Sequence, residues 1–153
     1  MFSAQEIAKW FLIRDRAVDN ELEISNLKLQ KLLYYAQGVY LAITEKPLFS
    51  DEILAWKHGP VVKEVYDNFC SNGGSIIEYN PREEDIDIIR KIENDENARD
   101  TLEFVIEEFG QYTAWKLRDM THEERPWLST KQNDVIDNEL IRNYFIDEVV
   151  EVN

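Results

Sequence analysis

Residues 26–43 form the segment that most restricts how this chain can fold. Ser25 or Asn26 can cap a helix there, and that helix carries apolar or aromatic residues around most of its circumference. A helix of this kind is usually buried on nearly all sides. We therefore expect a mainly α fold, compact and built around a central helix 26–43. Its apolar positions are Leu27, Leu29, Leu32, Leu33, Tyr34, Tyr35, Ala36, Val39, Tyr40 and Leu41.

The polar positions of this central helix are also ordered. Lys28, Lys31, Tyr35 and Gly38 follow one another in steps of three, four and three, so they share one helix face. The two lysines form the most cationic feature of the chain. They are either contacts for a partner or solvated lysines at the rim of the core. A second polar face holds Asn26, Gln30 and Gln37.

Capping signals and apolar stripes predict the other helices. Ser3 and Glu6 form a capping box that begins a first helix, and Asp137 can cap a final helix over residues 138–150. An amphipathic helix that ends near Gly110 follows a shorter, weaker one, and residues 113–120 form another short helix. We expect about six helices in all.

Two short apolar runs predict a small two-stranded β element. Residues 53–56 are too few for a helix and are bounded by polar residues, and residues 76–79 are their expected pairing partner. Pro60 suits the first position of a third helix, which would bury Val61, Val65 and Phe69. The segment 121–127 is expected to be largely non-helical.

The 153 residues, 44% of them hydrophobic, are enough for one well-covered core. We expect a single domain over 1–153. The first residues do not resemble a signal peptide, and no stretch reaches the roughly 20 apolar residues that span a bilayer. The single cysteine, Cys70, fits a reducing compartment, so we expect the cytoplasm.

The net charge of -14 is concentrated in the second half of the chain. Residues 1–70 carry 8 Lys and Arg against 10 Asp and Glu, whereas residues 71–153 carry 9 against 21. Such a surface repels phosphate backbones and anionic membranes, which disfavours nucleic-acid and membrane binding and favours a basic protein partner. The alternative is that the acidic residues only keep the protein soluble.

No motif predicts catalysis, a metal or a cofactor. His122 and Glu123 begin a zinc-protease pattern, but Pro126 stands where the second histidine would be needed. Neither a phosphate-binding glycine loop nor a closely spaced set of zinc ligands is present in the sequence. Cys70 follows Phe69 at the end of an amphipathic helix, so a packed thiol is the expected role.

Two segments are not explained by core packing alone. Residues 55–61 and 121–127 each combine a tryptophan, a histidine and a proline, a mixture that suits a protein-binding hot spot. The alternative is that Trp56 and Trp127 cover the core while His58 and His122 bind the main chain. With the helix positions above, the candidate partner-binding residues are Lys28, Lys31, Tyr35, Trp56, His58, Gly59, Pro60, Thr121, His122, Pro126 and Trp127.

The same segments resemble the Panacea domain of bacterial and phage antitoxins. The matching stretches are residues 24–38, 47–49, 55–61 with 65–66, and 121–122 with 126–127. The resemblance implies a helical fold with a small strand element and a protein that neutralises a toxin, by direct binding or by delivering it to a cellular protease as SocA-like adaptors do. The toxin is expected to be basic and encoded by the adjacent gene.

The resemblance implies no catalytic residues, and we expect neither enzymatic activity nor operator binding. Two other functions remain open from the sequence alone. One is a Cys-His hydrolase that uses Cys70. The other is an acidic phage or prophage decoy that mimics nucleic acid.

Overall fold

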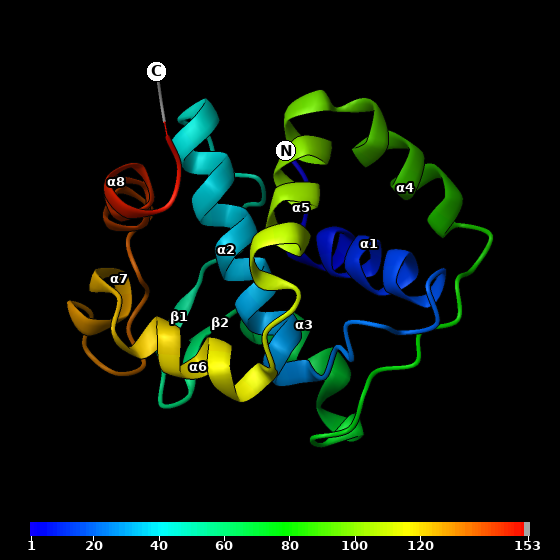
Figure 1. Cartoon of the computed structure of the whole chain (residues 1–153), viewed down its shortest axis with the longest axis horizontal. Coiled ribbons are helices and arrows are strands. Elements are labelled where there is room, and N and C mark those ends of the chain that lie inside the picture. The colour runs from blue at the N-terminus through cyan, green and yellow to red at the C-terminus, as the bar shows by residue number, and fades with distance from the viewer. Residues whose placement is uncertain (152–153) are drawn as a thin grey trace.

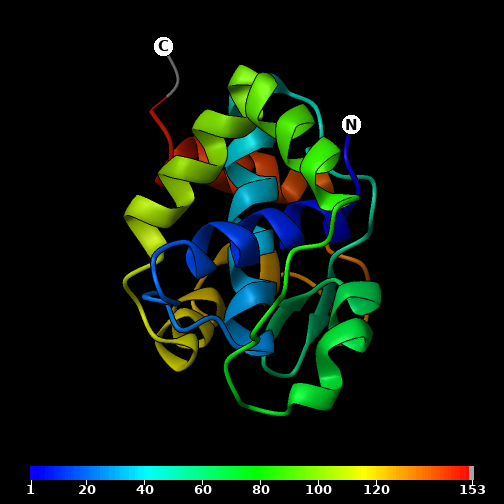
Figure 2. The same cartoon turned by 90° about the vertical axis from the view of Figure 1, so that its right-hand side faces the viewer.

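Helix α2 (Asn26–Thr44) runs through the middle of the molecule, as its apolar circumference predicts (Figure 1). The structure is a computed structural model that describes residues 1–151. Fifteen of the 19 residues of α2 are buried, because helices α1, α3, α5, α6 and α8 and strand β2 all pack against it. Figure 2 shows α1 crossing this central helix. The mainly helical fold is confirmed.

The described residues form eight α-helices instead of about six. Part of the difference is a short helix of four residues, Arg125–Leu128. The remaining elements are α1 (Ala4–Arg16), β1 (Leu54–Trp56), β2 (Gly59–Val61), α3 (Lys63–Phe69), a 3-10 turn η1 (Cys70–Asn72), α4 (Asp85–Asn94), α5 (Glu96–Phe109), α6 (Ala114–His122), α7 (Arg125–Leu128) and α8 (Asn138–Glu148).

Side-chain caps begin several helices where the sequence predicts them. The capping box of α1 is complete, since the Glu6 N–H donates to the Ser3 hydroxyl over 3.1 Å and the Ser3 N–H donates to the Glu6 carboxylate over 2.9 Å. The Ser25 hydroxyl accepts the N–H of Lys28 at the start of α2. The Asp137 carboxylate caps α8. These bonds satisfy N–H groups that a helix leaves unpaired at its first turn.

The strand pairing predicted from the sequence is wrong. Strand β1 pairs with β2 in an antiparallel hairpin whose partners include Trp56 and Gly59, and residues 76–79 lie elsewhere. The Ile77 N–H donates to the carbonyl of Ile24 over 2.8 Å instead. A turn of two residues closes the hairpin because Gly59 adopts a φ of 105°, which favours glycine.

Strand β1 is also paired along its other edge. The stretch 133–136, which leads into α8, binds it through the Ala55 N–H to the Asp134 carbonyl (2.9 Å) and the Ile136 N–H to the Ile53 carbonyl (2.8 Å). Pro60 lies in β2, so the prediction that it begins a helix is wrong. Helix α3 begins at Lys63, after the chain has completed the hairpin.

The segment 121–127 is more helical than expected. Thr121 and His122 form the end of α6, and α7 follows after only two intervening residues, Glu123 and Glu124. Proline is tolerated in the first turn of α7, where its missing N–H would have no helical partner. The two helices turn this segment back toward the hairpin.

The second polar face of α2 fixes the course of two loops. The amide oxygen of Gln30 accepts the N–H of Val62 over 2.8 Å. Gln37 accepts the N–H of Leu48 over 2.8 Å and donates to the carbonyl of Phe49 over 2.9 Å. These buried amides therefore bind main-chain groups that would otherwise lack partners inside the protein.

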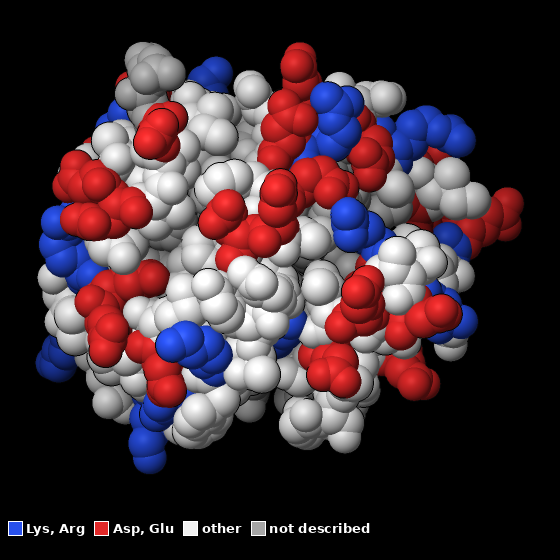
Figure 3. Space-filling model, viewed as in Figure 1, with Lys and Arg blue, Asp and Glu red and all other residues white. Residues whose placement is uncertain are grey.

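Acidic residues form several clusters on one face of the molecule, including clusters over α5 and α8, with uncharged surface between them (Figure 3). This distribution follows from the acidic excess of the second half of the chain. Among the described residues, no helix is both long and apolar enough to cross a membrane.

Candidate protein-binding site

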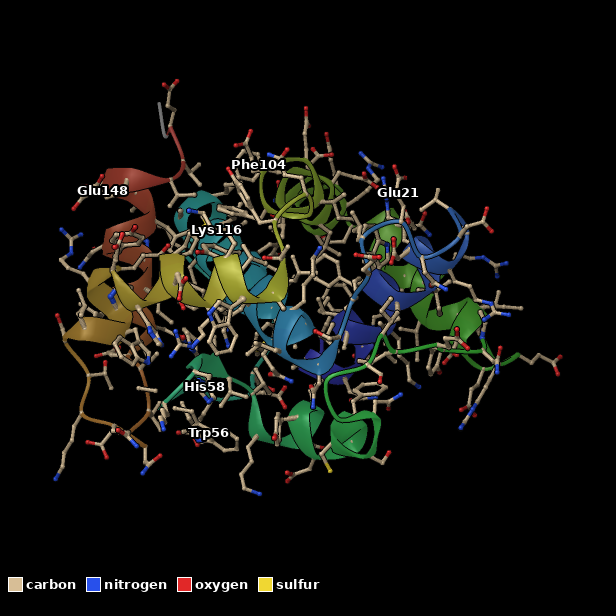
Figure 4. All side chains as sticks on the ribbon, turned by 60° about the horizontal axis from the view of Figure 1, so that its bottom comes forward. Glu21, Trp56, His58, Phe104, Lys116 and Glu148 are labelled. Carbon is tan, nitrogen blue, oxygen red and sulfur yellow. The ribbon has the colours of Figure 1, made fainter. Side chains whose placement is uncertain are left out.

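The two segments that combine tryptophan, histidine and proline meet in the structure. The indole N–H of Trp127 donates to the carbonyl of Trp56 over 2.8 Å. The His122 ring stacks on the Trp127 ring, with centroids 4.1 Å apart and an interplanar angle of 20°. Figure 4 shows Trp56 and His58 on the hairpin below α6. Residues 55–61 and 121–127 therefore form one continuous region.

Trp127 has a structural role in this region, because its N–H is used inside the protein and its ring packs against the core. The neighbouring His122 is more unusual. Its Nε2 atom is buried and has no hydrogen-bond partner among the described residues. Burial, and then the positive charge of Arg118, lower the pKa of His122, which favours a neutral imidazole.

His58 binds a side chain and not the main chain. The Arg118 Nε–H donates to His58 Nδ1 over 3.1 Å, so the imidazole carries its proton on Nε2. Desolvation, followed by the charges of Arg118 and Lys57, lowers the pKa of His58. The neutral ring that results can accept the arginine and still donate from Nε2.

Arg118 joins His58 to an exposed tryptophan of α6. Its guanidinium lies 4.4 Å from the centroid of the Trp115 ring, and Trp115 is 56% exposed. The same guanidinium pairs with Asp119 over 2.9 Å. Neither Trp115 nor Arg118 was among the candidates from the sequence. The sequence does contain a signal for this cation–π pair, because a tryptophan three positions before an arginine in a helix lies on the same face as that arginine.

Lys31 lies beneath the hairpin and holds it against α2. Its ammonium donates to the carbonyl of Pro60 over 2.9 Å, and the residue is 1% exposed. Gly59 covers it, since a Cβ there would lie 2.7 Å from Lys31 Cε and 2.8 Å from Thr121 Oγ1. Burial, with the nearby charge of Arg118, lowers the pKa of Lys31 to about 7. Gly59 is thus required both by its φ and by this close packing.

A cavity of about 400 Å³ opens between the start of α2 and the hairpin. Its walls combine apolar and aromatic side chains with amides and cationic groups. No Asp or Glu is among the residues that line it. The lining residues are Asn26, Leu27, Gln30, Lys31, Trp56, Lys57, His58, Gly59, Val61, Tyr66, Gly73, Gln132 and Asn133.

Lys28 lies away from this cavity, and the interpretation of both lysines as solvated is wrong. Lys28 is 3% exposed, and its ammonium donates to the carbonyls of Leu22 (2.5 Å) and Gly110 (2.6 Å). It therefore connects the loop after α1 to the end of α5. Charge-bearing side chains are rarely buried unless they have such partners, which explains why sequence reasoning placed both lysines near solvent.

Tyr35 is fully buried and contributes to a different cluster. Its hydroxyl donates to one oxygen of Glu124 over 2.7 Å, and the hydroxyl of Tyr34 donates to the other over 2.9 Å. Burial raises the pKa of Glu124 to about 7, although the two hydroxyl groups oppose this rise. Pro126, two residues after Glu124, is buried as well.

The prediction that the Cys70 thiol is packed in the core is wrong, because Cys70 is exposed. Its Sγ donates to the carbonyl of Asp67 over 3.2 Å. The described residues contain no hydrogen bond between Cys70 and either histidine, and they contain no group of three His, Cys, Asp or Glu side chains that could hold a metal ion.

Comparison with known proteins places the chain in a family. The family described as "Antitoxin SocA-like, Panacea domain" matches residues 29–128, a range that includes every candidate residue except Lys28. The chain is similar to antitoxin SocA of Caulobacter vibrioides (strain NA1000 / CB15N), with 36% identity over 121 residues that cover 76% of this chain and 64% of that protein. It thus spans a little under two thirds of that relative. No solved structure matches. The chain belongs to the SocA-like antitoxin family with a Panacea domain.

Proposed function

We propose that the chain is an antitoxin that neutralises a protein toxin by binding it directly. The contact surface in this proposal consists of Trp56, His58, Trp115 and Arg118, which we call the hairpin–α6 surface. The observation that carries it is the exposed Trp115 ring under the Arg118 guanidinium, next to the hairpin. Tryptophan and arginine are among the residues most enriched at binding hot spots. Membership of an antitoxin family supports the function itself.

The acidic second half of the chain supports a basic toxin as the partner. Its carboxylates would attract a positively charged protein at long range and so raise the association rate. Association should slow as salt is raised from low to physiological concentration, because salt screens this attraction. An association rate that did not change with salt would contradict steering by charge but not binding itself.

Co-expression in bacteria tests both the function and the surface. The protein encoded by the adjacent gene should be toxic alone and tolerated together with this chain. Trp115→Ala should abolish protection without lowering stability, because the ring is 56% exposed. Ile86→Ala is the matched control, since Ile86 is a similarly exposed apolar residue (54%) on α4.

The outcomes separate the two parts of the proposal. If the unchanged chain gives no protection against its neighbour, the antitoxin function is wrong. If both variants protect as well as the unchanged chain, the function stands and the hairpin–α6 surface is wrong.

Delivery to a protease and simple blocking predict different fates for the toxin. An adaptor shortens the lifetime of the toxin in cells, and this effect disappears in a strain without the protease. A blocking antitoxin leaves the amount of toxin unchanged or increases it. Measuring toxin decay after synthesis is stopped, with and without this chain, decides between the two modes.

A further inference from the structure

The cavity between α2 and the hairpin is positively charged in a strongly acidic protein. The chain carries a net charge of -14, yet the cavity is lined by two lysines, Lys31 and Lys57, by the neutral ring of His58, and by no Asp or Glu. Arg118 is close enough to lower the pKa values of both Lys31 and His58 through its charge. The local field in the cavity therefore favours an anion, opposite to the field of the protein as a whole.

We propose that this cavity binds the C-terminal residue of the protein partner, with an apolar side chain in the cavity and the terminal carboxylate at its cationic groups. This inference rests on the proposed function, in that a protein partner must exist. It adds which part of that partner enters the protein and which groups receive it.

The walls of the cavity account for the apolar part of this ligand. Leu27, Trp56, Val61 and Tyr66 provide apolar surface, and the Trp56 and Tyr66 rings meet edge to face with centroids 5.1 Å apart. A volume of about 400 Å³ can hold one large side chain together with its carboxylate. An internal Asp or Glu brings a carboxylate but little apolar surface, whereas a C-terminal apolar residue brings both.

Unused hydrogen-bond donors in the cavity account for the carboxylate of the proposed ligand. The amide groups of Asn26 and Gln30 are already engaged, with each other and with the main chain of Tyr66 and Val62. The Lys31 ammonium has three donors but one hydrogen bond among the described residues, to the Pro60 carbonyl. A buried ammonium with so few partners is costly, and a carboxylate would supply both an acceptor and the opposite charge.

The same geometry predicts how the affinity for the ligand changes with pH. The groups whose charges interact with Lys31 are Arg118 and the imidazoles of His58 and His122, and both imidazoles are held in the neutral form by their lowered pKa values. Asp119 on α6 pairs with Arg118 over 2.9 Å and offsets part of its charge, and Lys57 lines the cavity. The carboxylate would bind best to protonated Lys31, whose pKa is about 7 in the free protein. Affinity should therefore fall as pH rises from 6.5 to 8.5, and binding at pH 8 should take up protons.

The probe for this test is N-acetyl-L-phenylalanine, which reproduces a C-terminal phenylalanine, and its carboxamide is the matched neutral control. Titration of the full, 15N-labelled chain followed by NMR should shift amide signals of the cavity residues. The acid should bind at least tenfold more tightly than the carboxamide. Equal binding of the two compounds, or shifts confined to other regions, would overturn the proposal.

Two charge-reversal variants locate the effect. Lys57→Glu should weaken binding of the acid at least fivefold, because it places a negative charge in the cavity wall. Lys46→Glu changes the net charge by the same amount at an exposed position just beyond the other end of α2, and it should leave the affinity unchanged. If both variants weaken binding equally, net charge and not the cavity governs the affinity, and the proposal fails.

A toxin extended by Gly-Ser-Lys at its C-terminus identifies the source of the carboxylate. The extension should weaken the complex at least tenfold, because the cavity would then face a lysine. If the complex is unaffected while the acid still binds, the cavity accepts free small carboxylates only and the proposal is wrong. If the acid binds but the unextended toxin is not neutralised, the antitoxin function fails, and with it the assignment of the carboxylate to a toxin.

Discussion

Replacing Glu124 by glutamine should remove a pH dependence from the stability of this fold. The Glu124 side chain is buried between the hydroxyl groups of Tyr34 and Tyr35, which donate to its two oxygens. Burial raises its pKa from 4.5 to about 7. The folded protein therefore binds a proton at Glu124 over a pH range in which the unfolded chain has already released it.

The sign and size of the effect follow from this difference. The stabilising contribution of the protonated carboxyl is fully present below pH 4.5, the pKa in the unfolded chain, and is lost as pH rises through about 7. A tenfold change in proton affinity is worth about 1.4 kcal/mol, so the complete loss is on the order of 3 kcal/mol. Between pH 5.5 and 8.5 the loss amounts to about 2 kcal/mol.

Urea unfolding followed by tryptophan fluorescence measures this difference. The unfolding free energy of Glu124→Gln should rise by about 2 kcal/mol relative to the unchanged protein between pH 5.5 and 8.5. Glu123→Gln is the matched control, because it makes the same side-chain replacement at the adjacent, exposed position. If the two variants show the same pH profile, Glu124 does not titrate as the structure implies.

Two further substitutions test the packing around α2. Gly38→Ala would place a Cβ inside the Phe145 ring where α2 meets α8, so urea unfolding should show a loss of about 1–3 kcal/mol; an unchanged midpoint would contradict the close approach of these helices. Lys28→Met would leave the buried carbonyl of Gly110 and the partly buried carbonyl of Leu22 without their donor and should cost about 1–3 kcal/mol, with faster hydrogen exchange in the loop 17–24. Lys63→Met, at an exposed lysine of α3, should change neither measurement.

The central helix and the helix starts could be predicted from the sequence because their causes are local. Apolar residues around the helix from Asn26 onward require burial, and Ser3, Ser25 and Asp137 satisfy N–H groups only a few positions away. The strand partner could not be predicted in the same way. Residues 76–79 have strand-forming side chains, but the left-handed conformation of Gly59 allows β1 to pair with the chain that immediately follows it.

The candidate site was predicted in part for a similar reason. The composition of the two segments singled out Trp56, His58 and Trp127. The structure joins these segments through the hydrogen bond between Trp127 and Trp56, where the end of α6 and helix α7 lie beside the hairpin. The burial of Lys31 and the pairing of Glu124 with two tyrosines depend on contacts between residues 29 and about 90 positions apart. The role of Arg118 depends on the hairpin lying beside α6, which no local pattern indicates. That the candidate residues bind a partner stays a prediction.

The bonds from α2 to the surrounding loops have a consequence for how this protein can change over evolutionary time. Gln30, Gln37, Lys28 and Lys31 bind main-chain N–H and carbonyl groups, which every residue except proline supplies in full. The loops can therefore exchange their outward side chains while the bonds that fix their course are retained. A lineage can then acquire a new partner through surface substitutions alone, with the same scaffold inherited unchanged.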